Sequence, residues 1–128
     1  MSSLLLDIED KDVKLSLELR GLYPKVVDSL ADHLHKEAVA RGWWNEARND
    51  GELIALMHSE LSEALETLRE PQKPSEHIPQ FTGLEEELAD AVIRIFDYAA
   101  ARRVRLGAAI MAKADFNKTR ALRHGKKF

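Results

Sequence analysis

The chain has no cysteine among its 128 residues, and this absence excludes several kinds of chemistry. Disulfide bonds, zinc–thiolate sites, iron–sulfur clusters and thiol nucleophiles all require cysteine sulfur. A reducing environment fits the same absence, and we expect a cytoplasmic protein. Any catalytic or metal-binding site must therefore use oxygen and nitrogen atoms.

Long apolar runs and an excess of positive charge are also missing. No stretch approaches the roughly 18 apolar residues that a membrane span requires. The leucine run at residues 4–6 is too short for a signal sequence and has no basic residues before it. The net charge is −3, so no general positive field favours nucleic acid as a partner. We expect a soluble protein without a membrane or nucleic-acid partner.

The residues that are present predict an all-α protein, a bundle of about four helices. Apolar residues recur at helical spacing from Pro24, which suits a first helical turn, to about Gly42, which suits a helix end. Three further helices are predicted over residues 49–69, 83–103 and 106–121. Asn49 or Asp50 can cap the first of these, and Thr82 and Glu85 have the spacing of a capping box at the start of the helix over 83–103. Prolines between residues 71 and 79 predict a loop.

The first 22 residues show no clean helical period. Leu15, Leu17 and Leu19 alternate with polar residues, which predicts a short strand or an ordered arm. We therefore expect two parts, an N-terminal arm or extension over residues 1–22 and one helical domain over residues 23–128.

Two acidic motifs are the most informative feature of the chain: Glu60-x-x-Glu63 in the second predicted helix and Glu87-x-x-Asp90 in the third. Residues three apart lie on one face of a helix. If the two helices pack together, four carboxylates meet, and two such charges about 4 Å apart repel by roughly 4 kcal/mol. Such a cluster needs raised pKa values or a bound cation, and oxygen ligands suit Mg²⁺, with Mn²⁺ as a substitute.

A cationic stripe lies near the C-terminus. Lys113, Asn117 and Arg120 are spaced i, i+4 and i+7 and share one face of the fourth predicted helix. Their hydrogen-bond donors and two positive charges suit phosphate oxygens. Acidic pairs and such stripes are each common on solvated helices. Their joint occurrence in this order is what favours a functional site over a solvated surface.

These motifs resemble one family. Residues 58–66, residues 85–94 and the pattern Lys113-x-x-x-Asn117-x-x-Arg120 are similar to the MazG-like all-α nucleoside triphosphate pyrophosphohydrolases. This superfamily also includes dCTP pyrophosphatases and phosphoribosyl-ATP pyrophosphohydrolase. The resemblance covers about residues 24–127. The chain departs from the family in having Ser59 where a further glutamate often precedes the first motif.

The resemblance implies a role for each motif. Glu60, Glu63, Glu87 and Asp90 would bind the metal, and Glu63 would also orient the attacking water. Lys113, Asn117 and Arg120 would lie near the triphosphate, and Trp43 or Trp44 would line the base pocket. We also expect Asp97 to support the metal ligands, with Arg94 paired to it or to Glu87.

The implied activity is Mg²⁺-dependent hydrolysis of a nucleoside triphosphate between its α- and β-phosphates, giving a monophosphate and pyrophosphate. Clearing abnormal nucleotides from the cellular pool is one role consistent with it, and the resemblance further implies a homodimer or homotetramer. Two alternatives stay open: a non-enzymatic helical module that regulates or binds a partner, and hydrolysis of phosphoribosyl-ATP. A di-iron bundle is disfavoured because the helices that carry the acidic motifs lack its Glu-x-x-His pairs.

Overall fold

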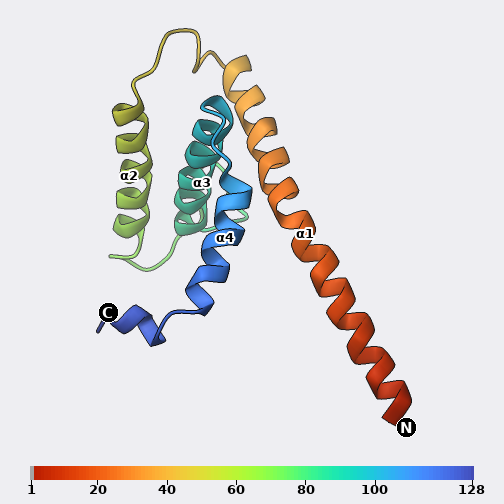
Figure 1. The fold of residues 1–128 in the computed structure, drawn as a ribbon. Helices are drawn as coiled ribbons and strands as arrows, with labels where there is room; N and C mark the ends of the chain where they lie inside the picture. The colour runs from red at the N-terminus through yellow and green to blue at the C-terminus, as the bar shows by residue number, and fades with distance from the viewer. Residues whose placement is uncertain (1) are drawn as a thin grey trace. The chain divides into compact units, whose positions relative to one another are not determined.

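A computed structural model describes residues 2–128, and it describes the side chains of residue 16 and residues 18–128. This part of the chain contains four α-helices and no β-strand, so the all-α prediction is confirmed. The elements are α1 (Ser2–Ala40), α2 (Asp50–Thr67), α3 (Gly83–Ala101), α4 (Leu106–Lys118) and the short 3₁₀-helix η1 (Leu122–Gly125) (Figure 1). Among the described helices, none is long and apolar enough to cross a membrane.

Helix α1 begins much earlier than the sequence predicted. It runs from Ser2, so the strand or non-helical arm predicted for residues 1–22 is wrong for residues 2–22, and Pro24 lies inside the helix instead of at its start. The leucines at 15, 19 and 22 also have the i, i+4, i+7 spacing of a helix face, which the alternation of 15, 17 and 19 obscured. The division into an arm and a domain at residue 22 stays a prediction.

The chain divides into two compact units, which we describe separately. One unit consists of residues 1–29 and 105–128, and the other of residues 30–104. The first unit contains the N-terminal part of α1 together with α4 and η1. The second contains the end of α1 with α2 and α3, and therefore both acidic motifs.

In the first unit, α4 approaches α1 closely at Gly107. A Cβ atom at Gly107 would lie 2.7 Å from Pro24 Cα and 2.9 Å from Asp28 Oδ1. The backbone N–H of Gly107 donates a hydrogen bond of 3.1 Å to the same Asp28 oxygen. Arg20 of α1 also forms an ion pair with Asp115 of α4. Glycine is thus required here because the two backbones leave no room for a side chain.

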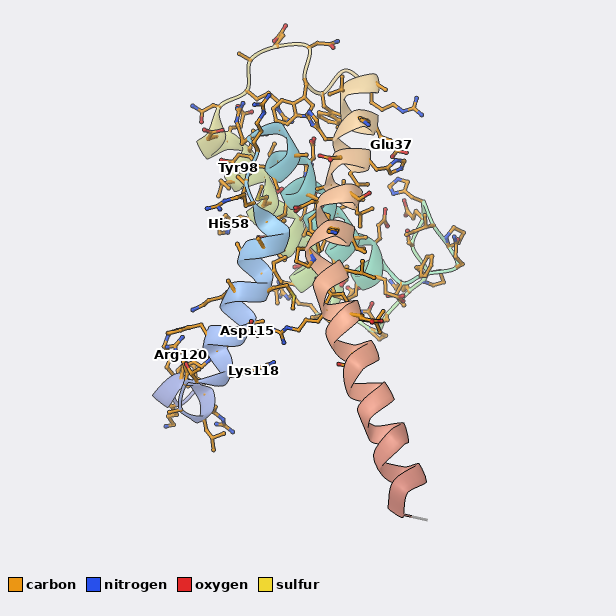
Figure 2. The ribbon with its side chains drawn as sticks, turned by 45° about the vertical axis from the view of Figure 1, so that its right-hand side comes forward. Glu37, His58, Tyr98, Asp115, Lys118 and Arg120 are labelled. Atoms are coloured by element: carbon orange, nitrogen blue, oxygen red, sulfur yellow. The ribbon has the colours of Figure 1, made fainter. Side chains whose placement is uncertain are left out.

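Helix α4 ends at Lys118, earlier than the predicted residue 121. The hydroxyl of Thr119, the residue after the helix, donates a 2.7 Å hydrogen bond to the carbonyl oxygen of Phe116. Thr and Ser hydroxyls that bond nearby carbonyls in this way favour helix ends. Arg120 therefore lies beyond the helix (Figure 2 labels Asp115, Lys118 and Arg120).

In the second unit, α2 and α3 run side by side (Figure 1). Ala64 of α2 and Ala91 of α3 are buried, and such small side chains let two helices approach closely. The predicted helix starts are confirmed: Asn49 Oδ1 accepts a hydrogen bond of 3.1 Å from the N–H of Glu52, and Thr82 and Glu85 form the capping box. This packing brings the two acidic motifs together.

The predicted proline-rich loop joins α2 to α3 and is fixed by Ser75, which is 5% exposed. The Ser75 hydroxyl accepts hydrogen bonds from the backbone N–H groups of His77 (3.2 Å) and Ile78 (3.1 Å). It also donates to the carboxylate of Glu86 on α3. The second Glu86 oxygen lies 2.5 Å from His77 Nδ1, and this contact raises the pKa of His77. The loop is thereby fastened to the helix turn that precedes Glu87.

Candidate metal centre and the adjoining cavity

Three carboxylates meet between α2 and α3. One oxygen from each of Glu60, Glu63 and Glu87 lies within 4.8 Å of the others. Glu60 is only 7% exposed, Glu87 is partly buried and Glu63 is exposed. Glu60 and Glu63 come from successive turns of α2, as their spacing predicted, and Glu87 comes from the second turn of α3.

Glu87 has an unusual environment for a carboxylate. Its Oε2 atom is buried and has no hydrogen-bond partner among the described residues. Burial, together with the neighbouring carboxylates of Glu63 and Glu60, raises the pKa of Glu87 to about 7. A buried acceptor without a partner costs free energy, so this oxygen has the capacity to bind a proton or a cation.

Glu60 is held as an anion by Arg94. Arg94 Nε donates a hydrogen bond of 2.7 Å to Glu60 Oε1. Burial tends to raise the pKa of Glu60, but the hydrogen bond and positive charge of Arg94, with hydrogen bonds from its carboxylate neighbours, bring this pKa below its ordinary value. The predicted pairing of Arg94 with Asp97 or Glu87 is therefore wrong, because the guanidinium of Arg94 reaches across from α3 to α2.

Asp90, the fourth predicted metal ligand, is not part of the three-carboxylate group. It lies one turn beyond Glu87 on α3 and, with Glu60, lines the wall of a cavity. Burial and the charges of Glu60 and Glu86 raise the pKa of Asp90. An aspartate side chain is one methylene shorter than a glutamate, so from the same helix face it reaches less far.

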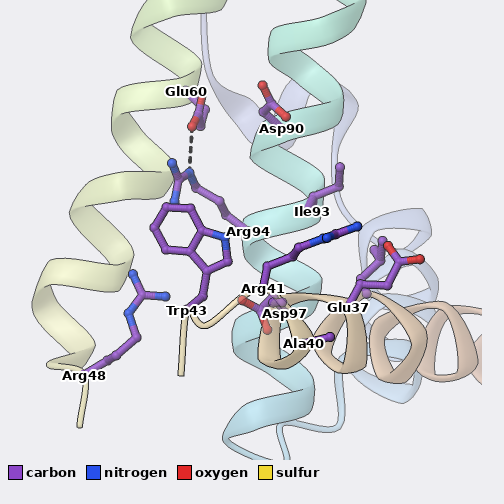
Figure 3. Close-up of a pocket in the computed structure, with 12 residues that line it drawn as sticks. Glu37, Ala40, Arg41, Trp43, Arg48, Glu60, Asp90, Ile93, Arg94 and Asp97 are labelled. Atoms are coloured by element: carbon purple, nitrogen blue, oxygen red, sulfur yellow. Dashed lines mark hydrogen bonds and ion pairs between the residues drawn. The ribbon is translucent and has the colours of Figure 1, made fainter. Parts of the chain in front are cut away.

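The cavity beside the carboxylates has a volume of about 630 Å³, which is in the range of small-molecule sites. Acidic and basic side chains share its wall with one aromatic ring, that of Trp43, and Figure 3 shows Arg94 bonded to Glu60 in this wall. Trp43 is 58% exposed. The residues of the wall that matter here are Glu60, Asp90, Arg94, Trp43, Arg41 and Arg48.

Trp44 differs from its neighbour Trp43 and is not among the residues that line this cavity. Its indole N–H donates hydrogen bonds of 3.0 and 3.1 Å to the two carboxylate oxygens of Asp97. His35 Nδ1 lies 2.7 Å from Asp97 Oδ1, and the His35 and Trp44 rings pack edge to face at 5.3 Å. Asp97 therefore joins the end of α1 and the segment after it to α3.

Arg48 lies over both indole rings. Its Cζ atom is 5.8 Å from the centroid of Trp43 and 5.2 Å from that of Trp44. A guanidinium group over an indole face is attracted by the ring electrons. Of the two tryptophans predicted for a base pocket, the structure thus places Trp43 in the cavity wall and uses Trp44 to hold Asp97.

The predicted phosphate-binding residues belong to the first unit. Lys113 Nζ lies 4.7 Å and Arg120 Cζ lies 5.7 Å from the centroid of the Phe116 ring. Asn117 Oδ1 is buried and has no hydrogen-bond partner among the described residues. Lys113 and Arg120 therefore both contact the ring of Phe116, although Arg120 lies beyond the helix. That these residues bind a triphosphate stays a prediction.

The sequence did not predict three side chains of this region: Arg41 and Arg48 in the cavity wall, and His35 beside Asp97. His35 comes from α1 and reaches Trp44 through the fold of the chain, whereas Arg48 follows Trp44 in the same segment. A signal was present for Arg48, since a cation a few residues after two tryptophans favours cation–π contact. Comparisons with protein-family models, with curated proteins and with solved structures found no match.

Proposed function

We propose that the protein is a Mg²⁺-dependent nucleoside triphosphate pyrophosphohydrolase with a MazG-like helical fold. The observation that carries the proposal is the meeting of Glu60, Glu63 and Glu87 from two helices, with one buried oxygen left without a partner. The neighbouring cavity, with its aromatic and cationic wall, supports a nucleotide-like ligand.

The donor set fits magnesium. All of its atoms are carboxylate oxygens, which are the hard ligands that Mg²⁺ prefers. Glu60, Glu63 and Glu87 would hold the ion, and Asp90 at the cavity wall would complete the set. The bound ion would supply positive charge to phosphate oxygens and make a bound water more acidic.

The side chains of this site suit the remaining tasks. Glu63 is exposed beside two less exposed carboxylates, so it would orient the attacking water and accept its proton. Trp43 presents its ring to the cavity and would stack on the base. Lys113 and Arg120 would balance charge on the leaving pyrophosphate, with Asn117 as a further hydrogen-bonding group.

The direct test is pyrophosphate release from a panel of canonical and modified nucleoside and deoxynucleoside triphosphates, and from phosphoribosyl-ATP. We expect turnover of at least one nucleotide with Mg²⁺ or Mn²⁺ and none with EDTA. Glu60→Gln and Glu63→Gln should each lower kcat by at least about 100-fold, because loss of a metal ligand exceeds the loss typical of a supporting residue.

Glu66→Gln is the matched control, because it removes a carboxylate one turn beyond Glu63 that lies on the exposed surface and pairs only with Arg69. This variant should keep wild-type turnover. If phosphoribosyl-ATP is the one compound that is hydrolysed, the protein is instead a phosphoribosyl-ATP pyrophosphohydrolase of the same superfamily. No turnover of any compound, and no metal-dependent rise in melting temperature, would favour a non-enzymatic helical module.

A further inference from the structure

Among the residues whose side chains are described, Arg94 is the one basic residue that forms an ion pair with the carboxylate group. Its Nε–H bonds Glu60 at 2.7 Å, and this is the one hydrogen bond that its guanidinium makes among the described residues. The Arg94 side chain is 31% exposed whereas that of Glu60 is 9% exposed. Arginine has five N–H donors, so this contact leaves the two terminal nitrogens of the guanidinium with open hydrogen-bonding capacity.

Arg94 lies at the wall of the cavity. It lines the 630 Å³ cavity together with Trp43 and Asp90, and Figure 3 shows its side chain bonded to Glu60 in this wall. A planar guanidinium whose two terminal nitrogens are free matches the oxygens of a phosphate group and binds them in a forked manner. The cavity wall therefore combines an arginine that can bind an anion through two nitrogens with the aromatic ring of Trp43.

The acidic neighbours of Arg94 do not cancel this capacity. Asp97, the next acidic residue on α3, is already occupied by the Trp44 indole and by His35. Glu60 accepts from Nε and leaves the terminal nitrogens available. When Glu60 shares its charge with a divalent cation, the positive charge of Arg94 is less neutralised and attracts an anion more strongly.

We infer that Arg94 is a phosphate-positioning residue, which holds Glu60 through Nε and binds a phosphate group of the ligand through its two terminal nitrogens. This inference rests on the proposed function and deepens it. It places a phosphate between the carboxylate group and Trp43, so that a nucleotide lies with its base at Trp43 and its first phosphate at Arg94. The occupant of the cavity is then a phosphorylated aromatic compound.

The affinity for inorganic pyrophosphate, which can be measured whether or not the protein hydrolyses nucleotides, tests this inference. Isothermal titration of inorganic pyrophosphate, with EDTA and with Mg²⁺, would be compared among wild type, Arg94→Gln, Arg94→Lys and the charge-matched control Arg69→Gln. We expect Arg94→Gln to weaken pyrophosphate binding roughly 10- to 100-fold, as for a lost charged hydrogen bond. Arg94→Lys should give an intermediate affinity because it keeps the charge and loses the fork, and Arg69→Gln should match wild type.

Two further readouts distinguish phosphate positioning from a purely structural role. The Nε–H signal of Arg94 in ¹⁵N-labelled protein should shift when pyrophosphate is added. Mn²⁺ binding, followed by electron paramagnetic resonance without phosphate, should be unchanged or tighter in Arg94→Gln because a competing cation has been removed. A purely structural role would instead weaken Mn²⁺ binding in Arg94→Gln and leave the Nε–H signal of the wild type unshifted by pyrophosphate.

Wild-type pyrophosphate affinity in Arg94→Gln, or no pyrophosphate binding to the wild type, would overturn the inference. Its failure is distinguishable from that of the proposed function. Pyrophosphate binding through Arg94 without hydrolysis of any nucleotide would refute the pyrophosphohydrolase and leave the anion site standing. Hydrolysis that persists while Arg94→Gln binds pyrophosphate normally would refute the anion site alone.

Discussion

Among single residues, Glu87 has the ionisation most altered by its surroundings. Burial and the carboxylates of Glu63 and Glu60 raise its pKa from an ordinary 4.5 to about 7. At Glu60 burial also acts to raise the pKa, but the hydrogen bond and charge of Arg94 outweigh it and leave the pKa of Glu60 lowered. Two carboxylates within one cluster therefore differ in protonation near neutral pH, as happens where like charges share a site.

This difference predicts how stability depends on pH without metal. The folded pKa of Glu87 exceeds the unfolded value, so folded protein binds the extra proton between about pH 4.5 and 7. The unfolding free energy should fall as pH rises through this window. We expect a loss of about 2 kcal/mol by pH 8, less than the full shift implies because water screens part of the repulsion.

Urea unfolding at pH 5 and pH 8 in EDTA measures this loss. Glu87→Gln should remove most of this loss and be more stable than wild type at pH 8, and saturating Mg²⁺ should have the same effect in the wild type. The raised pKa values of His77 and Asp90 leave a smaller loss in both cases. The control Glu66→Gln should retain the full loss. An equal loss in wild type and Glu87→Gln would show that other groups cause the pH dependence.

The sequence predicted a group of four carboxylates because helical spacing fixes which residues share a face. The structure brings three of them together and leaves Asp90 at the cavity wall. Glu60, Glu63 and Glu87 needed only two packed helices to meet. The sequence did not predict that Arg94 crosses to Glu60, or that Asp97 bonds Trp44. A long flexible side chain reaches several acceptors, and the choice among them depends on the relative position of helices, which no local pattern contains.

At the scale of helices, the contact between α1 and α4 leaves no room for a side chain at Gly107. A Cβ at Gly107 would lie 2.7 Å from Pro24 Cα, so Gly107→Ala forces the two backbones apart. We expect this change to lower the unfolding free energy by about 1–3 kcal/mol, as overpacking does elsewhere. Chemical unfolding followed by circular dichroism gives the value.

Gly21→Ala in α1 is the matched control. A Cβ at Gly21 meets no atom within 4 Å, and alanine is favoured over glycine in a helix by about 1 kcal/mol. This variant should therefore be more stable than wild type. Equal stability changes in both variants would mean that the α1–α4 contact is not close.

The starts of α2 and α3 were predicted better than the start of α1 and the end of α4. Thr82 with Glu85 and Asn49 before α2 carry their own capping signal, and such signals are local. Pro24 also looked like a helix start, since proline suits the first turn, yet α1 continues through it. A local pattern cannot tell a proline that begins a helix from one that tertiary packing tolerates inside it.

For the molecule as a whole, we predict a homodimer or homotetramer. Helix α2 carries the exposed apolar side chains Leu61 and Leu65, Leu68 follows directly after the helix, and Leu65 is 64% exposed. Covering a leucine in an interface contributes about 1.5–3 kcal/mol. Light scattering after size exclusion should give two or four times the chain mass of 14.5 kDa.

Leu65→Lys should lower this mass toward that of one chain, because it places a charge in the interface. Ser62→Lys adds the same charge to an exposed position of α2 outside the leucine stripe and should keep the wild-type mass. A single-chain mass for the wild type at micromolar concentration would contradict the oligomer.

The two adjacent tryptophans provide the chain with a pair of natural optical reporters. Trp44 is tied to Asp97 through its indole N–H, and Trp43 stands open to solvent in the cavity wall. An open indole emits at longer wavelengths than an enclosed one, so the two contributions separate within one spectrum. Light emitted by Trp43 therefore reports on the contents of the cavity, while light from Trp44 reports on whether the helices around Asp97 remain folded.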